Sequence, residues 1–148
     1  MIVELAHLLA TAAMGGLIWF VQIVHYPLFA RVGEADRVAY SRFHQTRTTF
    51  VVAPLMLAEA ITAVWLLLRP PPGVDPVLTF AGITCLAAAW VSTAAVQVPD
   101  HGRLGDPASS PDVVRRAAKR LVWTNWVRTL LWSVRTLIAG MIVLHAAA

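Results

Sequence analysis

Polar and ionisable side chains interrupt four apolar stretches of this chain at helical spacing. Residues three or four positions apart share one face of a helix, so each stretch should carry one polar stripe. Such side chains can coordinate a metal, transfer a proton or bind a ligand. The stripes contain His7, Thr11, Gln22 and His25; His44, Thr48, Glu59 and Thr62; Thr93, Gln97 and His101; and Asn125, Arg128, Trp132 and Arg135.

Three histidines come from three different stretches and fall at a similar depth when residues are counted along each helix. These are His25, His44 and His101. Imidazole suits Zn, Cu, Fe and Ni, so the three could hold a metal ion or a haem. No HxxxH or HExxH spacing accompanies them, and the alternative is that each histidine only forms hydrogen bonds in a polar interior or at a membrane interface.

Glu59 and Arg135 lie near the middle of their stretches. At a rise of about 1.5 Å per residue, Glu59 is about 18 Å from Arg47 and Arg135 is about 21 Å from Leu121. Either charge alone in mid-bilayer would cost about 2.5–3.5 kcal/mol or more, so we expect a Glu59–Arg135 ion pair. Alternatively, Glu59 relays a proton or completes a metal site.

Arg128 adds a second guanidinium to the expected interior, which then contains more cations than carboxylates. Such an excess suits a bound carboxylate, phosphate or haem propionate. The alternative is that Arg128 extends towards the membrane interface. Polar residues on the neighbouring stripes would orient the substrate: Gln22, Gln97, Asn125 and Trp132.

Composition places this chain outside the usual range of soluble domains. Of its 148 residues, 58% are hydrophobic and 14% are charged, against about 45–50% and about 25% in soluble domains. Four stretches reach the ~20 apolar residues that a membrane helix needs: about 2–26, 47–68, 77–98 and 121–146. We therefore expect an all-α, single-domain integral membrane protein, folded as an antiparallel four-helix bundle with a polar interior.

The distribution of basic residues predicts the orientation of these spans. Lys and Arg concentrate in the first and third connections, whereas the second connection holds only Arg69. By the positive-inside rule, connections one and three are cytoplasmic and both termini lie on the outer side. The net charge of +4 thus indicates membrane topology rather than nucleic-acid binding. Pro27 should end the first span, and residues 99–114 should form a polar loop.

Several segments carry resemblances to known families, among them HYPLFARVG, VVAPLMLAEA, VQVPDHGRL and NWVRTLLWSVR. Over nearly the whole chain, the sequence resembles small bacterial four-span membrane proteins with no established activity, which implies a bacterial inner-membrane location. The opening LAHLLATAAMGGLIWF looks more distantly like anthrone-oxygenase-like proteins. It also looks like haem-binding membrane proteins of the protoporphyrinogen-oxidase type, whose second-half Lys motif has no counterpart here. These two likenesses imply redox chemistry, and the second points to His7.

These patterns favour a metal- or haem-dependent membrane oxidoreductase or oxygenase-like enzyme acting on a small lipophilic or anionic substrate. His25, His44 and His101 would hold the metal or haem, and Glu59, Arg128 and Arg135 would form the catalytic set. One alternative is a non-catalytic protein that binds or transports a small molecule, anion or lipid, for which homo-oligomerisation would be needed. Another is a structural membrane subunit. Membrane lipids are the expected surroundings in every case.

Overall fold

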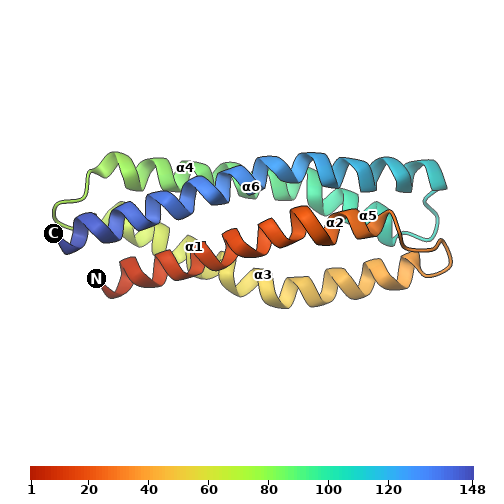
Figure 1. The fold of residues 1–148 in the computed structure, drawn as a ribbon, viewed down its shortest axis with the longest axis horizontal. Helices are drawn as coiled ribbons and strands as arrows, with labels where there is room; N and C mark the ends of the chain where they lie inside the picture. Colours follow the sequence, from red (N-terminus) through yellow and green to blue (C-terminus); the bar gives the residue numbers. More distant parts are fainter.

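The computed structural model describes all 148 residues and is all-helical. Four long helical rods lie side by side (Figure 1). The first rod joins α1 (Ile2–Phe20), the π-helical turn η1 (Val21–His25) and α2 (Tyr26–Phe29), and the second is α3 (Arg37–Leu68). The third joins α4 (Pro76–Ser92), η2 (Thr93–Gln97) and α5 (Val98–Gly105), and the fourth is α6 (Pro111–Ala147).

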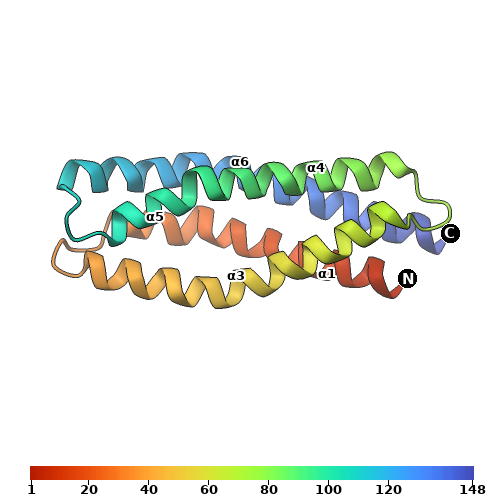
Figure 2. The ribbon, with the colours of Figure 1, turned by 180° about the vertical axis from the view of Figure 1, so that it is seen from behind.

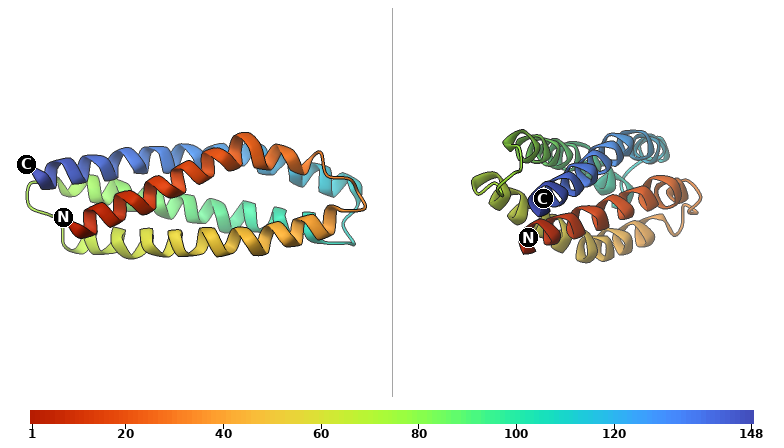
Figure 3. Two further views of the ribbon diagram at one scale, coloured as in Figure 1. Left: turned by 60° about the horizontal axis from the view of Figure 1, so that its bottom comes forward. Right: turned by 60° about the vertical axis from the view of Figure 1, so that its left-hand side comes forward.

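Successive rods run in opposite directions, so the molecule has two distinct ends. Both termini and the connection between α3 and α4 lie at one end, which we call the terminal end (Figures 1 and 2). The other two connections lie at the opposite end, which we call the basic end because the residues in and beside them are rich in Arg and Lys. The first rod packs against α3 and α6, and α4 packs against α3 and α6, which closes the bundle (Figure 3).

All four rods are long and apolar enough to cross a membrane. Large apolar side chains cover the outside of every rod, for example Leu9, Phe50, Phe80 and Leu137. Within the apolar spans, Glu59 and Arg135 are buried instead, which reverses the usual arrangement of a water-soluble protein. The expected polar stripes therefore do face the interior.

Two of the rods continue through prolines that the sequence suggested would end them. The N–H of Tyr26 bonds to the carbonyl of Val21, and the N–H of Val98 bonds to the carbonyl of Thr93. Each bond spans five residues and so widens the helix by one residue just before Pro27 or Pro99. A proline has no N–H and its ring crowds the carbonyl four residues earlier, and a π-helical turn relieves both problems.

This finding corrects two expected boundaries. Pro27 does not end the first helical rod, which continues to Phe29. Residues 99–105 are helical rather than part of a polar loop, and only residues 106–110 connect α5 to α6. The α6 helix begins at Pro111 after an extended Ser110, as Ser-Pro at a helix start favours.

The apolar core consists of three separate layers along the bundle. The layer at the basic end includes Phe29 and Leu121, the middle layer is built on Met14, Ile18, Ala89 and Trp132, and the terminal layer includes Leu66 and Ile142. Polar side chains occupy the interior between these layers. The middle layer therefore divides the polar interior into two parts.

Candidate functional site

The polar residues of the predicted stripes, with Tyr26, gather mainly in two clusters at different depths. The mid-bundle cluster contains His7, Glu59, Thr62, Trp132 and Arg135. The basic-end cluster contains Gln22, His25, Tyr26, His44, Gln97, His101, Asn125 and Arg128. The four predicted polar stripes therefore meet at two depths along the bundle. The face of the Trp132 ring, which borders Arg128, joins the two clusters.

In the mid-bundle cluster, the predicted ion pair is present. Arg135 Nη2 lies 3.1 Å from Glu59 Oε1 and Arg135 Nε lies 3.3 Å from the same atom, while Trp132 Nε1 donates to Glu59 Oε2 at 2.9 Å. Arg135 also donates to the carbonyl of Gly82, and both charged residues are fully enclosed. The adjoining cavity measures only about 10 Å³. The charges of Glu59 and Arg135 are thus neutralised by each other, and Trp132 and the Gly82 carbonyl supply further hydrogen bonds. These surroundings favour a structural role for the pair.

His7 and His145 differ in placement although both lie towards the terminal end. His7 is buried, and its Nδ1 lies 2.8 Å from the hydroxyl of Thr62. His145 is exposed, and its Nδ1 bonds to the carbonyl of Met141 in its own helix. His7 thus belongs to the bundle interior, whereas His145 lies on the surface.

In the basic-end cluster, the three predicted histidines do converge. The rings of His25 and His44 stack with centroids 4.3 Å apart, and those of His44 and His101 are 5.0 Å apart. His25 Nε2 lies 2.7 Å from His44 Nδ1, and Tyr26 Oη lies 3.1 Å from His101 Nε2. These nitrogens bond to each other and to the phenol, and no group of three or more His, Cys, Asp or Glu is arranged to hold a metal ion. The metal-ligand role stays a prediction.

A chain of amide hydrogen bonds ties this cluster to α6. Gln22 Nε2 donates to the carbonyl of Val122 at 3.1 Å, and Asn125 Nδ2 donates to Gln22 Oε1 at 3.0 Å. Arg128 Nη1 in turn donates to Asn125 Oδ1 at 3.1 Å. Gln97 donates to the hydroxyl of Thr124 at 3.2 Å. Gln22 and Gln97 both belong to π-helical turns, so η1 and η2 each direct an amide towards α6.

Arg128 is a buried cation with no carboxylate partner. Only 5% of its surface is exposed, no ion pair joins it to another residue, and its buried Nε has no hydrogen-bond acceptor. Its guanidinium carbon lies 5.3 Å from the centroid of the Trp132 ring, a distance at which the ring face attracts a cation. Nδ1 of His101, in the same cluster, is also buried without a partner.

Arg128 and His101 line a cavity of about 370 Å³ between α3 and the third rod. We call it the polar pocket. Its rim residues Thr49 and Val98 are exposed on the sides of α3 and α5, so the pocket opens between two rods rather than at the end of the bundle. The other lining residues are Tyr26, His44, Gln45, Thr48, Val52, Ala53, Met56, Thr93 and Gln97.

Sequence reasoning missed Tyr26 and Asp100. Tyr26 is buried and bonds to His101, and its position four residues after Gln22 could have placed it on the same stripe. Asp100 is 1% exposed and accepts hydrogen bonds from Arg103 at 2.6 Å and from Arg120 at 2.6 and 2.9 Å. The Arg120 bonds hold α5 against α6. No signal stronger than nearby opposite charges marks Asp100 in the sequence.

Comparison of the chain with protein-family models, with curated proteins and with solved structures finds no match. The family resemblances described above therefore stay predictions.

Proposed function

We propose that this is an integral membrane protein that binds a small amphiphilic anion in its polar pocket. Four helices of sufficient length and apolarity, with apolar side chains outside and charges inside, support placement in a bilayer. The basic end then faces the cytoplasm and both termini lie on the outer side, because basic connections are retained on the cytoplasmic side. A bacterial inner membrane is the proposed location.

The observation that carries this proposal is the unpaired guanidinium of Arg128 beside the polar pocket. A buried charge in a bilayer is normally paired with an opposite charge or with backbone carbonyls. Glu59 does not serve, because its ion pair is with Arg135 and none joins it to Arg128. A ligand carboxylate or phosphate in the polar pocket, which Arg128 lines, would supply the missing partner.

The remaining lining of the polar pocket specifies an amphiphilic ligand. Hydroxyl, amide and imidazole groups share the lining with Arg128, and Val52, Ala53 and Met56 add an apolar stretch of α3 beyond Thr48 and Thr49. An anionic head would bind at Arg128 and an apolar tail would extend along α3. Because the pocket opens between α3 and α5, the ligand would enter sideways from the bilayer.

Decanoate, with decanol as its neutral analogue, tests this proposal by calorimetry on detergent-purified protein. We expect decanoate to bind and decanol to bind at least tenfold more weakly. Arg128→Gln should weaken decanoate binding by about 10- to 100-fold, since a hydrogen bond to a charged group contributes about 1.5–3 kcal/mol. Arg47→Gln removes an exposed cation that lies over Phe43 and should have no effect. Equal binding of decanoate and decanol, or an unchanged affinity in Arg128→Gln, would overturn the proposal.

A second candidate function is a metal- or haem-dependent oxidoreductase or oxygenase-like enzyme acting on the same ligand. The convergence of His25, His44 and His101 from three rods favours it. A bound metal would replace the present hydrogen bonds among these rings. Elemental analysis and optical spectra of protein purified without chelator test this candidate. The paired substitution His44→Ala with His101→Ala should abolish retention of the metal or haem. Binding of decanoate by protein that retains neither would favour the non-catalytic function.

A further inference from the structure

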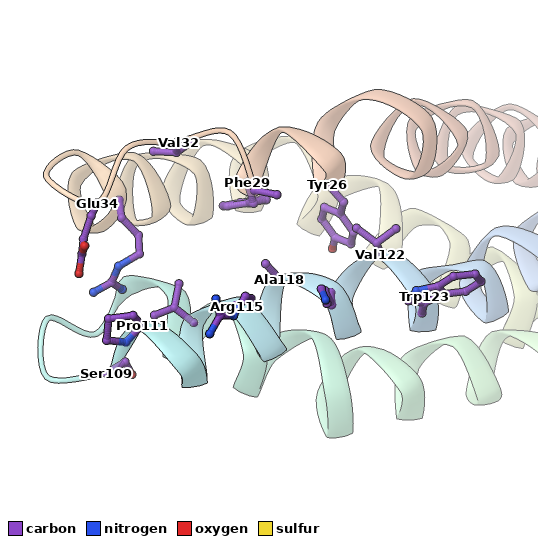
Figure 4. A pocket seen from close by; sticks show the side chains of 14 residues that line it. Tyr26, Phe29, Val32, Glu34, Ser109, Pro111, Arg115, Ala118, Val122 and Trp123 are labelled. Atoms are coloured by element: carbon purple, nitrogen blue, oxygen red, sulfur yellow. The ribbon is translucent and has the colours of Figure 1, made fainter.

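A second cavity lies on the other side of Tyr26, between α2 and the first turns of α6. We call it the α2–α6 groove, and its volume of about 490 Å³ exceeds that of the polar pocket. Figure 4 shows Tyr26 and Phe29 projecting from α2 towards Ala118 and Val122 of α6. None of the residues used for the anion-binding proposal lines this groove except Tyr26.

The groove exists because the first and fourth rods are close together at one point and are separated by small side chains further along. Near the middle of the bundle, a Cβ on Gly15 would lie 3.0 Å from Thr136 Oγ1. Towards the basic end, the lining from α6 includes one helical stripe of residues with short side chains, Val114, Ala118 and Val122. These side chains leave the space that Phe29 only partly fills.

Cationic side chains surround the groove where it reaches the basic end. Its lining includes Arg37, Arg115 and Lys119 but only one carboxylate, that of Glu34. Arg37 donates to the carbonyls of Leu104 and Asp106, and Arg115 is paired with Asp112 outside the groove. Lys119 has neither a hydrogen bond nor an ion pair. The groove lining therefore has a net positive charge, and the ammonium of Lys119 has no partner within the chain.

The apolar side of the groove continues along the outside of the bundle. Trp123 forms its wall and is 74% exposed, and Val127 and Leu130 follow on the same stripe of α6 at 53% and 60% exposure. An indole at this position is typical of a membrane interface. A molecule with a charged head at Lys119 could thus extend an apolar chain past Trp123 over a continuous apolar surface.

We propose that the α2–α6 groove binds an anionic phospholipid of the surrounding bilayer. Its phosphate lies at Lys119 and Arg115, and one acyl chain lies over Ala118 and Val122 and leaves past Trp123. Charge complementarity selects this ligand, because the groove combines a cationic end with an apolar floor at the depth where a lipid phosphate meets its acyl chains. The inference rests on the proposed placement in a membrane but not on the anion site at Arg128.

Native mass spectrometry of delipidated protein in neutral detergent tests the site, with dioctanoyl phosphatidylglycerol and dioctanoyl phosphatidylcholine as probes. We expect one phosphatidylglycerol to bind in preference to phosphatidylcholine. Lys119→Gln should weaken phosphatidylglycerol binding about fivefold, from the ~1 kcal/mol that one basic residue contributes at an anionic membrane surface. Arg116→Gln makes the same charge change on the preceding turn outside the groove and should leave binding unchanged.

A steric pair of variants tests the apolar half of the groove. Val122→Trp fills the floor and should abolish selective phosphatidylglycerol binding, whereas Val77→Trp makes the same change on the exposed surface of α4, away from the groove, and should preserve it. Equal binding of the two lipids, or equal losses in Lys119→Gln and Arg116→Gln, would overturn the inference. So would a dimer of the wild-type protein that Val122→Trp dissociates, since the groove would then hold a second copy of the chain.

The two proposed sites can fail independently. Arg128→Gln should bind phosphatidylglycerol normally, and Lys119→Gln should bind decanoate normally. If the protein incorporates into phosphatidylcholine vesicles but shows no preference for phosphatidylglycerol, the groove assignment is wrong while membrane placement stands. If it does not incorporate into vesicles of either lipid, the membrane placement itself is wrong.

Discussion

The indole Nε1 of Trp132 donates a 2.9 Å hydrogen bond to Oε2 of Glu59, inside the bundle and out of contact with solvent. The face of the same ring lies 5.3 Å from the guanidinium carbon of Arg128. Trp132 thus donates a hydrogen bond to Glu59, the only carboxylate in the mid-bundle cluster, and its ring also packs against the guanidinium of Arg128 in the polar pocket. Glu59 is paired with Arg135 and bonded to the Trp132 indole. Arg128 therefore has no carboxylate partner within the chain and is free to bind an anionic ligand.

Replacing Glu59 by Gln should strongly destabilise the protein. The substitution leaves the Arg135 guanidinium buried without its anion, and removing one partner of a buried ion pair costs about 3–5 kcal/mol. Equilibrium unfolding of the detergent-solubilised protein measures the change. Asp112→Asn breaks the exposed Arg115 pair at the basic end and should cost about 0–1 kcal/mol. Similar losses in the two variants would contradict the structural role assigned to Glu59.

Trp132→Phe should remove the hydrogen bond to Glu59 while keeping an aromatic face beside Arg128. One carboxylate oxygen then loses a buried donor, at a cost of about 1–3 kcal/mol in unfolding free energy. Decanoate affinity should change by less than twofold. Trp126→Phe is the matched control, because Trp126 packs edge-on against Trp19 at 5.7 Å but its indole nitrogen has no acceptor. A larger loss of stability in Trp126→Phe would show that packing, not the hydrogen bond, dominates at Trp132.

The Glu59–Arg135 pair could be predicted from sequence because two simple constraints define it. The helical rise fixes the depth of each residue, and a bilayer penalises either charge alone. The same counting brought His25, His44 and His101 to one level, and the three rings do meet. When a helix is regular, the spacing of residues in the sequence gives both the helix face and the depth in the bundle of each residue.

Other features could not be predicted, because they depend on side-chain packing and on departures from regular helix. The layer of Met14, Ile18 and Trp132 that separates the two clusters looks in the sequence like ordinary apolar filling. A π-helical turn adds one residue to a helical turn, so residues after it change face. The unpartnered Nε of Arg128 likewise emerges only from the packed structure.

Pro27→Ala should shift the position of the residues that follow η1. Alanine restores an N–H and removes the ring, so the rod can return to regular α-helix, which rotates Tyr26 and Phe29 relative to Gln22. Because Tyr26 lines the polar pocket, we expect decanoate affinity to fall at least fivefold with little change in helical content by circular dichroism.

Pro54→Ala is the control for this substitution, because α3 stays α-helical through Pro54. Its decanoate affinity should match that of the wild-type protein. A Pro27→Ala variant with unchanged affinity would show that packing alone maintains the π-helical turn, even without the proline.

Adjacent glycines in α1 provide the sharpest test of how the bundle is held together. A Cβ on Gly15 would lie 3.0 Å from Thr136 Oγ1 and 3.8 Å from the carbonyl oxygen of Trp132, whereas a Cβ on Gly16 would meet nothing within 4 Å. In Gly15→Ala the Thr136 hydroxyl or α1 must therefore move by a few tenths of an ångström, and overpacking of this kind costs about 1–3 kcal/mol.

Gly16→Ala should be neutral or stabilising, by up to about 1 kcal/mol, because alanine loses less backbone entropy in a helix than glycine. Thermal unfolding in detergent compares the two variants directly. Gly15→Ala should also weaken decanoate binding, since Trp132 carries the displacement to Arg128, and Gly16→Ala should not. Equal melting temperatures would mean that α1 and α6 approach each other less closely than the structure indicates, and the link through Trp132 would then lose its basis.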